Sequence, residues 1–326
     1  MGIGIRSLGV CIPERRITNE ELAGRIDTSD EWIVSHTGIR NRHIGAPEDA
    51  TSDLAARACQ SALERAGYEP GQVDMIITAT ASGDYAGFPA VACMVQEKIK
   101  APKSAAFDLN AGCTGFVYAM EVARGMIASG GCKTVLAVGA EMLSRITDWT
   151  DRDTCVLFGD GAGAAVITEL EGDSGILKSI LRSDGRGADY LKRTAGGSRF
   201  PYREGVTQAR DFAISMDGRK VYNFAVGANC DLLELLFAQM GITADDIAYI
   251  VPHQANIRII QAAAKRMKIA EEKYYVNIDE YANTSAASIP IALNEMDEKG
   301  LLKKGDLIIT IGFGAGLTYG CNLIRW

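Results

Sequence analysis

The sequence predicts an α/β fold built from parallel sheets with helices on both faces. Short, almost continuous apolar runs alternate with longer stretches of helical periodicity, which is the pattern of strands that are buried on both sides. The chain also runs through one series of elements twice, and its 35 glycines suit many tight strand-to-helix turns. A chain of 326 residues is at the upper size for one core, so one large α/β unit or two core-forming halves are expected.

The apolar runs and the helical stretches locate the expected elements. Strands are expected at 73–80, 133–140, 163–168, 247–251 and 306–311. Helices are expected at 52–66, 89–99, 115–129, 220–240, 256–268 and 288–299. Alternation of the two kinds along the chain is typical of βαβ units.

The repeated series indicates how the chain is divided. A helix ending in AGY leads through EPGQVD to the strand MIITAT, and a second helix ending in MGI leads through TADDI to AYIVP. We therefore expect an internal duplication with halves at 1–172 and 173–326. The glycine- and arginine-rich stretch 182–210 is expected to be a long surface excursion, and such excursions in compact domains are often functional.

The composition argues against several classes of function. The formal net charge is −7, whereas nucleic-acid binders usually carry a basic field. No stretch approaches about 18 uninterrupted apolar residues, and the charged start lacks the apolar region of a secretory signal. A cytoplasmic protein without membrane attachment is therefore expected. None of the eight cysteines forms a C-x-x-C pair, which argues against a metal site or a redox motif.

The stretch DLNAGCTGFVYAM places Cys113 at the start of an expected helix. Unpaired N–H groups and the positive end of the helix dipole stabilise a thiolate there, so a lowered thiol pKa is expected. Gly112 and Gly115 allow a sharp turn and a close backbone approach. The same pattern suits a small buried cysteine at a strand–helix junction, and this stretch alone does not decide between nucleophile and packing residue.

Three later stretches contain further candidates. His253, in VPHQANIR, follows an expected strand at the edge where α/β sheets bind ligands, although a core histidine has the same pattern. Asn283, in YANTSAAS, precedes a helix, and this stretch alone favours an ordinary N-cap over a functional residue. The loop in ITIGFGAGLTYG presents backbone N–H groups suited to an oxyanion, but it lacks the spacing of a dinucleotide-binding motif.

In combination, these motifs resemble one family. C-T-G-F, H-Q-A-N-I-R, N-T-S-A-A-S and G-F-G-A-G-L-T-Y-G occur in this order after DTSDEWIVSHTGIRNRHI. From Ile3 to Trp326 the chain is similar to the β-ketoacyl-[acyl carrier protein] synthase III family. The resemblance implies a thiolase-like fold, in which two duplicated βαβαβ halves form five αβαβα layers, and a homodimer.

The resemblance also implies a reaction and its partners. An acyl-CoA primer, acetyl-CoA or another short one, would condense with malonyl-[acyl carrier protein] as carbon dioxide is lost, which initiates fatty-acid synthesis. No cofactor and no metal are implied. Asn283 distinguishes the chain from elongating condensing enzymes, which use a second histidine. The loop GFGAG distinguishes it from thiolases, which carry a second cysteine there, since Cys321 lies beyond it.

Roles for individual residues follow from the same resemblance. Cys113, His253 and Asn283 would form the catalytic triad, with the N–H groups of Cys113 and Ala315 as the oxyanion hole. The residues implied to bind coenzyme A are Thr28, Trp32, His36, Arg152 and Asn256. Those implied to form the acyl pocket are Phe88, from the partner subunit, with Leu143, Phe158 and Phe313. Those implied to dock the carrier protein are Arg258, Lys265 and Arg266.

The sequence departs from the family pattern at two positions, and two alternative functions remain open. His36 stands where many members of the family have an arginine near the coenzyme A phosphates, and Asn223 where a lysine is frequent. Relatives in secondary metabolism use the same triad to prime polyketides or to make quinolones. A protein that only binds acyl-CoA, without a covalent intermediate, is the alternative from a different class.

Overall fold

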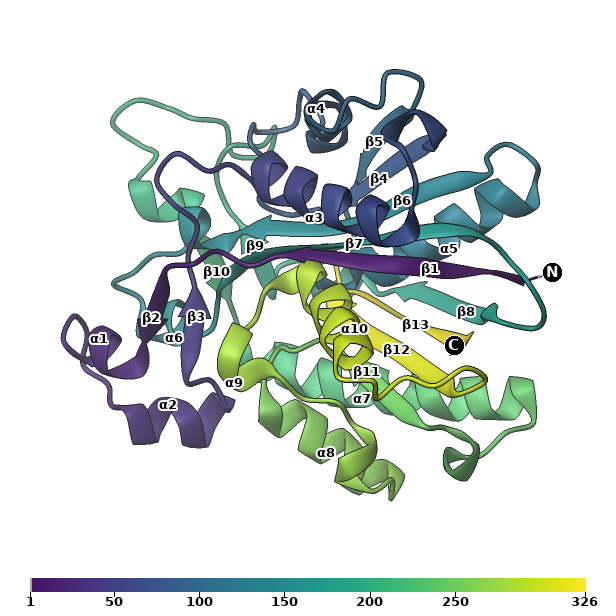
Figure 1. Cartoon of the computed structure of the whole chain (residues 1–326). Helices are drawn as coiled ribbons and strands as arrows, with labels where there is room; N and C mark the ends of the chain where they lie inside the picture. The colour runs from purple at the N-terminus through teal and green to yellow at the C-terminus, as the bar shows by residue number, and fades with distance from the viewer. Residues whose placement is uncertain (1) are drawn as a thin grey trace.

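Two stacked β-sheets dominate the structure, a computed structural model that describes residues 2–326 (Figure 1). The first sheet has the strand order β1-β7-β6-β4-β5 and the second the order β11-β12-β13-β8. The strands of the first sheet are β1 (Gly2–Cys11), β4 (Met75–Ala79), β5 (Ala105–Leu109), β6 (Thr134–Met142) and β7 (Asp160–Leu170). Those of the second are β8 (Gly175–Ser183), β11 (Tyr249–Pro252), β12 (Leu307–Gly314) and β13 (Thr318–Arg325).

Helices lie outside and between the two sheets. The longer ones are α2 (Asp30–Thr37), α3 (Thr51–Ala66), α4 (Val91–Lys98), α5 (Gly115–Ala128), α7 (Gly218–Met240), α8 (Ile257–Met267) and α10 (Ser288–Glu298). The shorter ones are α1 (Asn19–Ala23), α6 (Arg152–Cys155) and α9 (Ile278–Tyr281). Two small two-stranded antiparallel sheets complete the fold, β2 (Arg16–Thr18) with β3 (Asn41–His43) and β9 (Leu191–Arg193) with β10 (Ile214–Met216).

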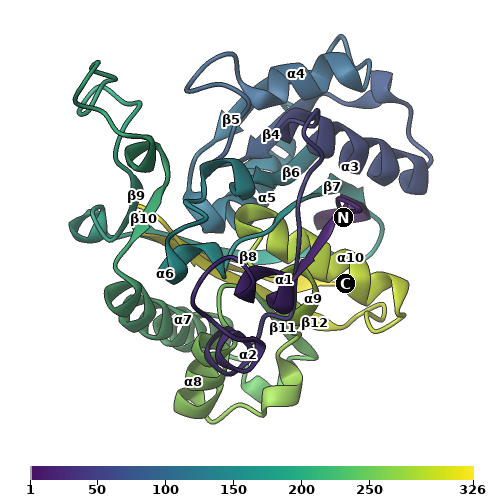
Figure 2. The same ribbon diagram turned by 90° about the vertical axis from the view of Figure 1, so that its left-hand side faces the viewer.

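The elements stack in five layers. Helices α3 and α4 cover the outer face of the first sheet, and α7 with α8 covers the second (Figures 1 and 2). Helix α5 packs against strands of both sheets, and α10 contacts β7, β6 and β11, so these two helices form the central layer. Their buried faces are apolar or small, with Phe116, Met120 and Leu293 in the core. The predicted αβαβα arrangement is confirmed.

The two sheets share one plan. In each, the strand after the first outer helix (β4 or β11) pairs in parallel with a strand (β6 or β12) that pairs antiparallel with the strand following it in the chain (β7 or β13). The outer helices α3 and α7 both end at a left-handed glycine, Gly67 (φ +69°) and Gly241 (φ +65°). The counterpart of β5 is reduced to one bridge between Ile250 and Tyr274. A boundary at residue 172 remains a prediction, although the strands of the two sheets lie on opposite sides of it.

The prediction of wholly parallel sheets is wrong in part. Strand β4 is parallel to β5 and β6, and β11 to β12, but β1, β7, β8 and β13 pair antiparallel with their neighbours. The chain returns from β6 to β7 through 143–159, which does not pass over the sheet as a long crossover helix does. A strand that is buried on both faces has the same apolar run whether it pairs in parallel or antiparallel, so the sequence pattern does not distinguish the two kinds of pairing.

The stretch 182–210 is an excursion, as the sequence predicts. It continues from β8 through the hairpin of β9 and β10, whose loop at 194–213 extends from the body of the molecule (Figure 2). Tyr202 and Val206 are exposed there. Among the described residues, no helix is both long and apolar enough to span a membrane.

Candidate active site

One cavity of about 210 Å³ is lined by Cys113, His253 and Asn283. Cys113 lies in a 3₁₀ turn that leads into α5, and His253 follows β11. Asn283 lies just before a second 3₁₀ turn that leads into α10. The three side chains are far apart in the sequence and meet because both central helices begin at this end of the sheets.

The turn of Cys113 packs against the glycine loop that follows β12. A Cβ on Gly112 (φ +52°) would lie 2.7 Å from the Ala315 nitrogen, and a Cβ on Gly314 would lie 2.5 Å from the Cys113 nitrogen. These separations exclude side chains at both positions. The N–H groups of Cys113 and Ala315 therefore lie on adjoining backbone segments, as an oxyanion hole requires; their role remains a prediction.

His253 is buried and uncharged at neutral pH. Burial lowers its pKa to about 3. Its Nδ1 lies 2.8 Å from Ser288 Oγ, and that oxygen accepts the Gln254 N–H at 3.3 Å. Donation of the Ser288 hydroxyl proton to Nδ1 would place the imidazole proton on Nε2. In that tautomer, Nε2–H is a neutral donor beside the cavity.

Asn283 is fixed on both sides by residues from the first half of the chain. Its N–H donates to Leu157 O and its carbonyl accepts from Gly159 N, both at 3.0 Å. Its side-chain Oδ1 accepts from Ser285 N at 2.9 Å. The amide oxygen is thus bonded to the backbone two residues on, whereas the N-cap residues of the turn and of α10 are Thr284 and Ala287. The Nδ2 donors remain for a ligand in the cavity.

The predicted lowering of the Cys113 pKa is wrong for the substrate-free structure. Burial raises the pKa of this thiol to about 12, and the nearby Glu141 carboxylate also raises it. The nearby Ser285 side chain and the backbone N–H of Cys113 act in the opposite direction, but loss of hydration outweighs them. The resting thiol is therefore protonated at neutral pH.

A smaller cavity of about 90 Å³ continues beyond Cys113. Leu143 and Phe158 line it together with Cys113, as predicted for an acyl pocket. Phe313 lines the larger cavity instead, where its ring meets the His253 ring edge-on at 5.4 Å. Phe88 lines neither cavity and is 85% exposed. An acyl-pocket role for Phe88 would therefore require a second subunit.

Trp32 lies at the mouth of the larger cavity. The Arg152 guanidinium carbon is 4.3 Å from the Trp32 ring centre, and the His36 ring stacks on Trp32 at 4.4 Å. Stacking a planar base between Trp32 and Arg152 would need about 7 Å between them, which is two contact distances. Arg152 would therefore have to swing aside. Thr28 Oγ1, also at this end, is buried without a hydrogen-bond partner among the described residues.

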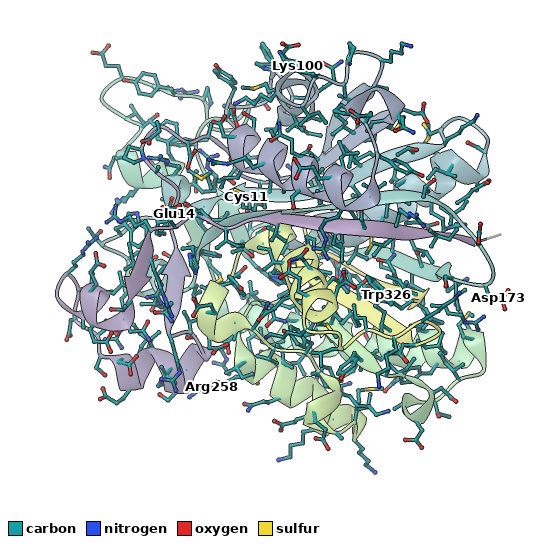
Figure 3. The ribbon with its side chains drawn as sticks, in the orientation of Figure 1. Cys11, Glu14, Lys100, Asp173, Arg258 and Trp326 are labelled. Atoms are coloured by element: carbon teal, nitrogen blue, oxygen red, sulfur yellow. The ribbon has the colours of Figure 1, made fainter. Side chains whose placement is uncertain are left out.

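The start of α8 joins this mouth to the predicted docking residues. Asn256 Oδ1 accepts from Arg258 N at 2.8 Å, and its Nδ2 donates to His36 O at 3.0 Å. Arg258 Nε donates to Ser35 O at 3.0 Å, so its cationic side chain spans α2 and α8 (Figure 3). Lys265 and Arg266 are exposed farther along α8.

Comparison with known proteins agrees with this geometry. A family model described as 3-Oxoacyl-[acyl-carrier-protein (ACP)] synthase III matches residues 107–185, and its C-terminal counterpart matches 237–326. A beta-ketoacyl-[acyl-carrier-protein] synthase III of Caldanaerobacter subterraneus subsp. tengcongensis is 48% identical over 99% of this chain and 97% of its own. The chain belongs to the β-ketoacyl-[acyl carrier protein] synthase III family.

Solved structures of related proteins have the same fold. The crystal structure of 3-oxoacyl-[acyl-carrier-protein] synthase III from Aquifex aeolicus VF5 matches with a TM-score of 0.92 at 41% identity, over 100% of both chains. The priming β-ketosynthase of the R1128 polyketide biosynthetic pathway matches with a TM-score of 0.91 at 31% identity, over 99% and 96% of the two chains. The thiolase-like fold predicted from the resemblance is thereby confirmed.

Three residues near the cavity of this synthase III family member were not predicted. Ser285 and Ser288 lie within the stretch NTSAAS, so their motif was recognised but their side chains were not. Glu141 ends the apolar run TVLAVGAEM, where a lone carboxylate was the only signal. Across residues 2–326, no group of three His, Cys, Asp or Glu side chains is placed to hold a metal ion.

Proposed function

We propose that this protein condenses an acyl-CoA primer, acetyl-CoA above all, with malonyl-[acyl carrier protein]. The products are acetoacetyl-[acyl carrier protein], carbon dioxide and coenzyme A, which starts fatty-acid synthesis. One observation carries the proposal: a thiol, a neutral Nε2–H and a free amide group, from Cys113, His253 and Asn283, line one cavity. A nucleophile and two uncharged donors are what a decarboxylating Claisen condensation needs.

The first stage transfers the acyl group to Cys113. The sulfur attacks the thioester carbonyl, and the N–H groups of Cys113 and Ala315 stabilise the oxyanion that forms. Coenzyme A then leaves, and the acyl chain occupies the small cavity beside Leu143 and Phe158. The limited volume of that cavity favours a short primer.

The second stage uses the two donors. As the malonyl group loses carbon dioxide, negative charge grows on its thioester oxygen, and His253 Nε2–H and Asn283 Nδ2 stabilise this enolate. Neutral donors suit this step, because a charged imidazolium would transfer its proton to the carbanion. The carbanion attacks the acyl carbon on Cys113, and the sulfur is released. No cofactor is needed in this scheme.

The surface supports the proposed partners. Trp32, Arg152 and Thr28 would receive the adenine end of coenzyme A, with His36 and Asn256 beside them. Arg258, Lys265 and Arg266 would contact the acidic carrier protein. Exposed Tyr85, Phe88 and Phe107 lie near the open edge strand β5, which supports a homodimer. A cytoplasmic location remains a prediction of the sequence.

The experiment that tests the proposal is acylation with labelled acetyl-CoA. We expect one acetyl group per chain, on the Cys113 peptide, and turnover to acetoacetyl-[acyl carrier protein] when malonyl-[acyl carrier protein] is added. Stable absence of label on Cys113 would refute the proposal and favour an acyl-CoA-binding protein.

A second candidate function is priming in secondary metabolism, which the likeness to the R1128 priming β-ketosynthase favours. In this function the same catalytic residues would act on a different acyl primer. Competition between acetyl-CoA and longer acyl-CoA primers for Cys113 separates the two, since a preference for the longer primer supports the second candidate.

A further inference from the structure

One charged side chain in the core takes no part in the proposed condensation. Arg42, in β3, is fully buried, and within residues 2–326 its guanidinium forms no ion pair with a carboxylate. Burial lowers its pKa to about 10, so the side chain still carries its charge at neutral pH. Arginine is almost never fully buried without a charged partner, because a cation loses much of its hydration free energy there. The contacts of Arg42 indicate what this buried charge does.

The Arg42 guanidinium joins three segments of the chain. Its Nη2 donates to Asn19 Oδ1 at 2.8 Å and to Val156 O at 3.1 Å. Its Nη1 donates to Ile17 O at 3.4 Å. The Asn19 amide in turn donates to Asp30 Oδ1 at 2.8 Å. A carboxylate is therefore connected to the cation only through a neutral amide, and the contact with Val156 leads toward the active site.

The segment 156–159 holds Asn283 from both sides. Leu157 O accepts from Asn283 N, and Gly159 N donates to Asn283 O, both at 3.0 Å. Phe158 lies between these two bonds and forms an isolated parallel bridge with Asn283. The backbone of Asn283, and with it the root of its side chain, therefore follows the position of this segment.

Arg42 contacts the segment at both ends. Its guanidinium bonds to Val156 O, and a Cβ on Gly159 would lie 3.4 Å from the Arg42 Cβ. Val156 is itself buried, where a carbonyl without a donor is costly. Because the guanidinium is planar and carries its N–H groups in a rigid fork, it fixes the direction of the Val156 carbonyl as well as its distance. A lysine or an apolar side chain would not do both.

We propose that Arg42 is a positioning residue that holds Asn283 at the distance and orientation needed for decarboxylation of the malonyl group. It acts through Val156 and the segment 156–159, and it lines neither of the two cavities beside Cys113. The proposal rests on the proposed condensation, in which Asn283 Nδ2 stabilises the enolate. Misplacement of such a donor by about 1 Å can slow a reaction by about 10²-fold.

Arg42→Met tests the proposal, because methionine removes the charge and the donors and still fills much of the space. Decarboxylation of malonyl-[acyl carrier protein] is measured beside single-turnover acylation of Cys113 by acetyl-CoA. We expect decarboxylation to fall by about 10- to 10²-fold, since the Asn283 donor is no longer held in place. Acylation should fall by less than about threefold, because the oxyanion donors of that stage, Cys113 and Ala315, are not bonded to the segment 156–159.

A double-variant cycle tests whether Arg42 acts through Asn283. In the Asn283→Ala background, Arg42→Met should slow the remaining decarboxylation by less than about twofold, since the amide that Arg42 positions is already absent. A residue that only supports the fold would slow decarboxylation as much in this background as in the wild-type protein. The cycle therefore separates positioning of one donor from a general structural role.

A second arginine serves as the matched control. The Arg145 guanidinium also donates to backbone carbonyls, those of Ala46 at 2.7 Å and Pro47 at 3.1 Å, but it does so at the surface. Arg145→Met should therefore leave both half-reactions unchanged. If Arg42→Met does not fold, Arg42→Lys decides by the same comparison, because it keeps the charge and loses the planar fork. A selective loss of decarboxylation in Arg42→Lys supports the proposal, and wild-type rates overturn it.

The remaining outcomes also decide. Unchanged decarboxylation in Arg42→Met would overturn the proposal, as would equal losses in both half-reactions or a full further loss in the Asn283→Ala background. If the wild-type protein neither acylates Cys113 nor decarboxylates malonyl-[acyl carrier protein], the proposed function is refuted instead. Failure of the inference and failure of the proposed function are thus distinguished by the wild-type rates.

Discussion

The starts of the two central helices, α5 and α10, have one backbone design and different chemistry. Each is preceded by a 3₁₀ turn whose first residue is left-handed, Gly112 at φ +52° and Ser285 at φ +50°. The two starts touch, since a Cβ on Gly115 would lie 3.5 Å from the Cβ of Ala286. The first start supplies the nucleophile and the second supplies Asn283.

The difference shows how each position is constrained. At Gly112 a side chain would collide with the Ala315 backbone, so only glycine fits. At Ser285 the same conformation tolerates a side chain, and this residue lines the small cavity together with Cys113. Left-handed backbone costs about 1–2 kcal/mol for a residue other than glycine, and the hydrogen bond from Ser285 N to Asn283 Oδ1 holds the turn in that conformation.

The largest expected effect comes from the first helix start. Cys113→Ala should lower condensation by about 10⁴-fold or more, because no acyl-enzyme forms. Decarboxylation of malonyl-[acyl carrier protein] should continue, since His253 and Asn283 are intact. Carbon dioxide release measured beside acetoacetyl product checks this, and loss of both activities would contradict the division between the helix starts.

The second helix start should show the reverse pattern. Asn283→Ala should reduce decarboxylation by about 10²–10³-fold, the usual cost of one lost oxyanion donor. Acylation of Cys113 should fall by less than about tenfold, because the amide acts on the malonyl oxygen. The ratio of the two single-turnover rates is the measurement, and equal losses would show that Asn283 serves both stages.

Stability should separate the two left-handed positions. Gly112→Ala should lower the free energy of unfolding by about 2–4 kcal/mol, through backbone strain and collision with Ala315. Ser285→Gly should raise it by up to about 1 kcal/mol, because glycine adopts this conformation without strain. Urea unfolding of both variants and of Ser285→Ala, the matched control, tests this; a destabilised Ser285→Gly protein would show that the hydroxyl contributes to folding.

The last effect concerns pH, and it is small over any single pH unit. Because burial holds the pKa of His253 near 3, against about 6.5 in an unfolded chain, the unfolded state binds a proton that the folded state does not between these values. The free energy of unfolding should therefore fall by up to about 1.4 kcal/mol per pH unit as pH drops from 6.5 toward 3. His253→Asn should show a shallower fall between pH 6 and pH 4, and identical slopes would contradict the assigned pKa.

Long periodic segments of the fold could be predicted from the sequence. The expected helix at 115–129 is α5, and the expected strand at 133–140 is β6 with two further residues. Strands β1 and β5 were missed, because β1 is interrupted by glycines and an arginine and β5 is five largely exposed residues at an edge. Whether neighbouring strands are parallel or antiparallel could not be predicted from the apolar pattern, because it depends on the path of the chain between the strands.

The candidate site was likewise predictable from the sequence only in part. Cys113, His253 and Asn283 were found because each lies in a motif at an element boundary, and the family that these motifs indicated is confirmed. The pKa of Cys113 was predicted in the wrong direction, because the sequence shows a helix start but not the burial around the sulfur. Glu141 was missed because only the folded chain brings this carboxylate near Cys113, where its charge raises the thiol pKa.

The two sheets differ at their outer edges, and this limits how copies of the chain can associate. Strand β5 is a largely exposed edge, whereas the matching edge of the second sheet carries the bridge between Ile250 and Tyr274. The opposite edges, β1 and β8, contact each other. Within residues 2–326, the central sheets thus offer one free edge, so strand addition joins two copies and then stops. The asymmetry between the halves favours a closed pair over a growing filament.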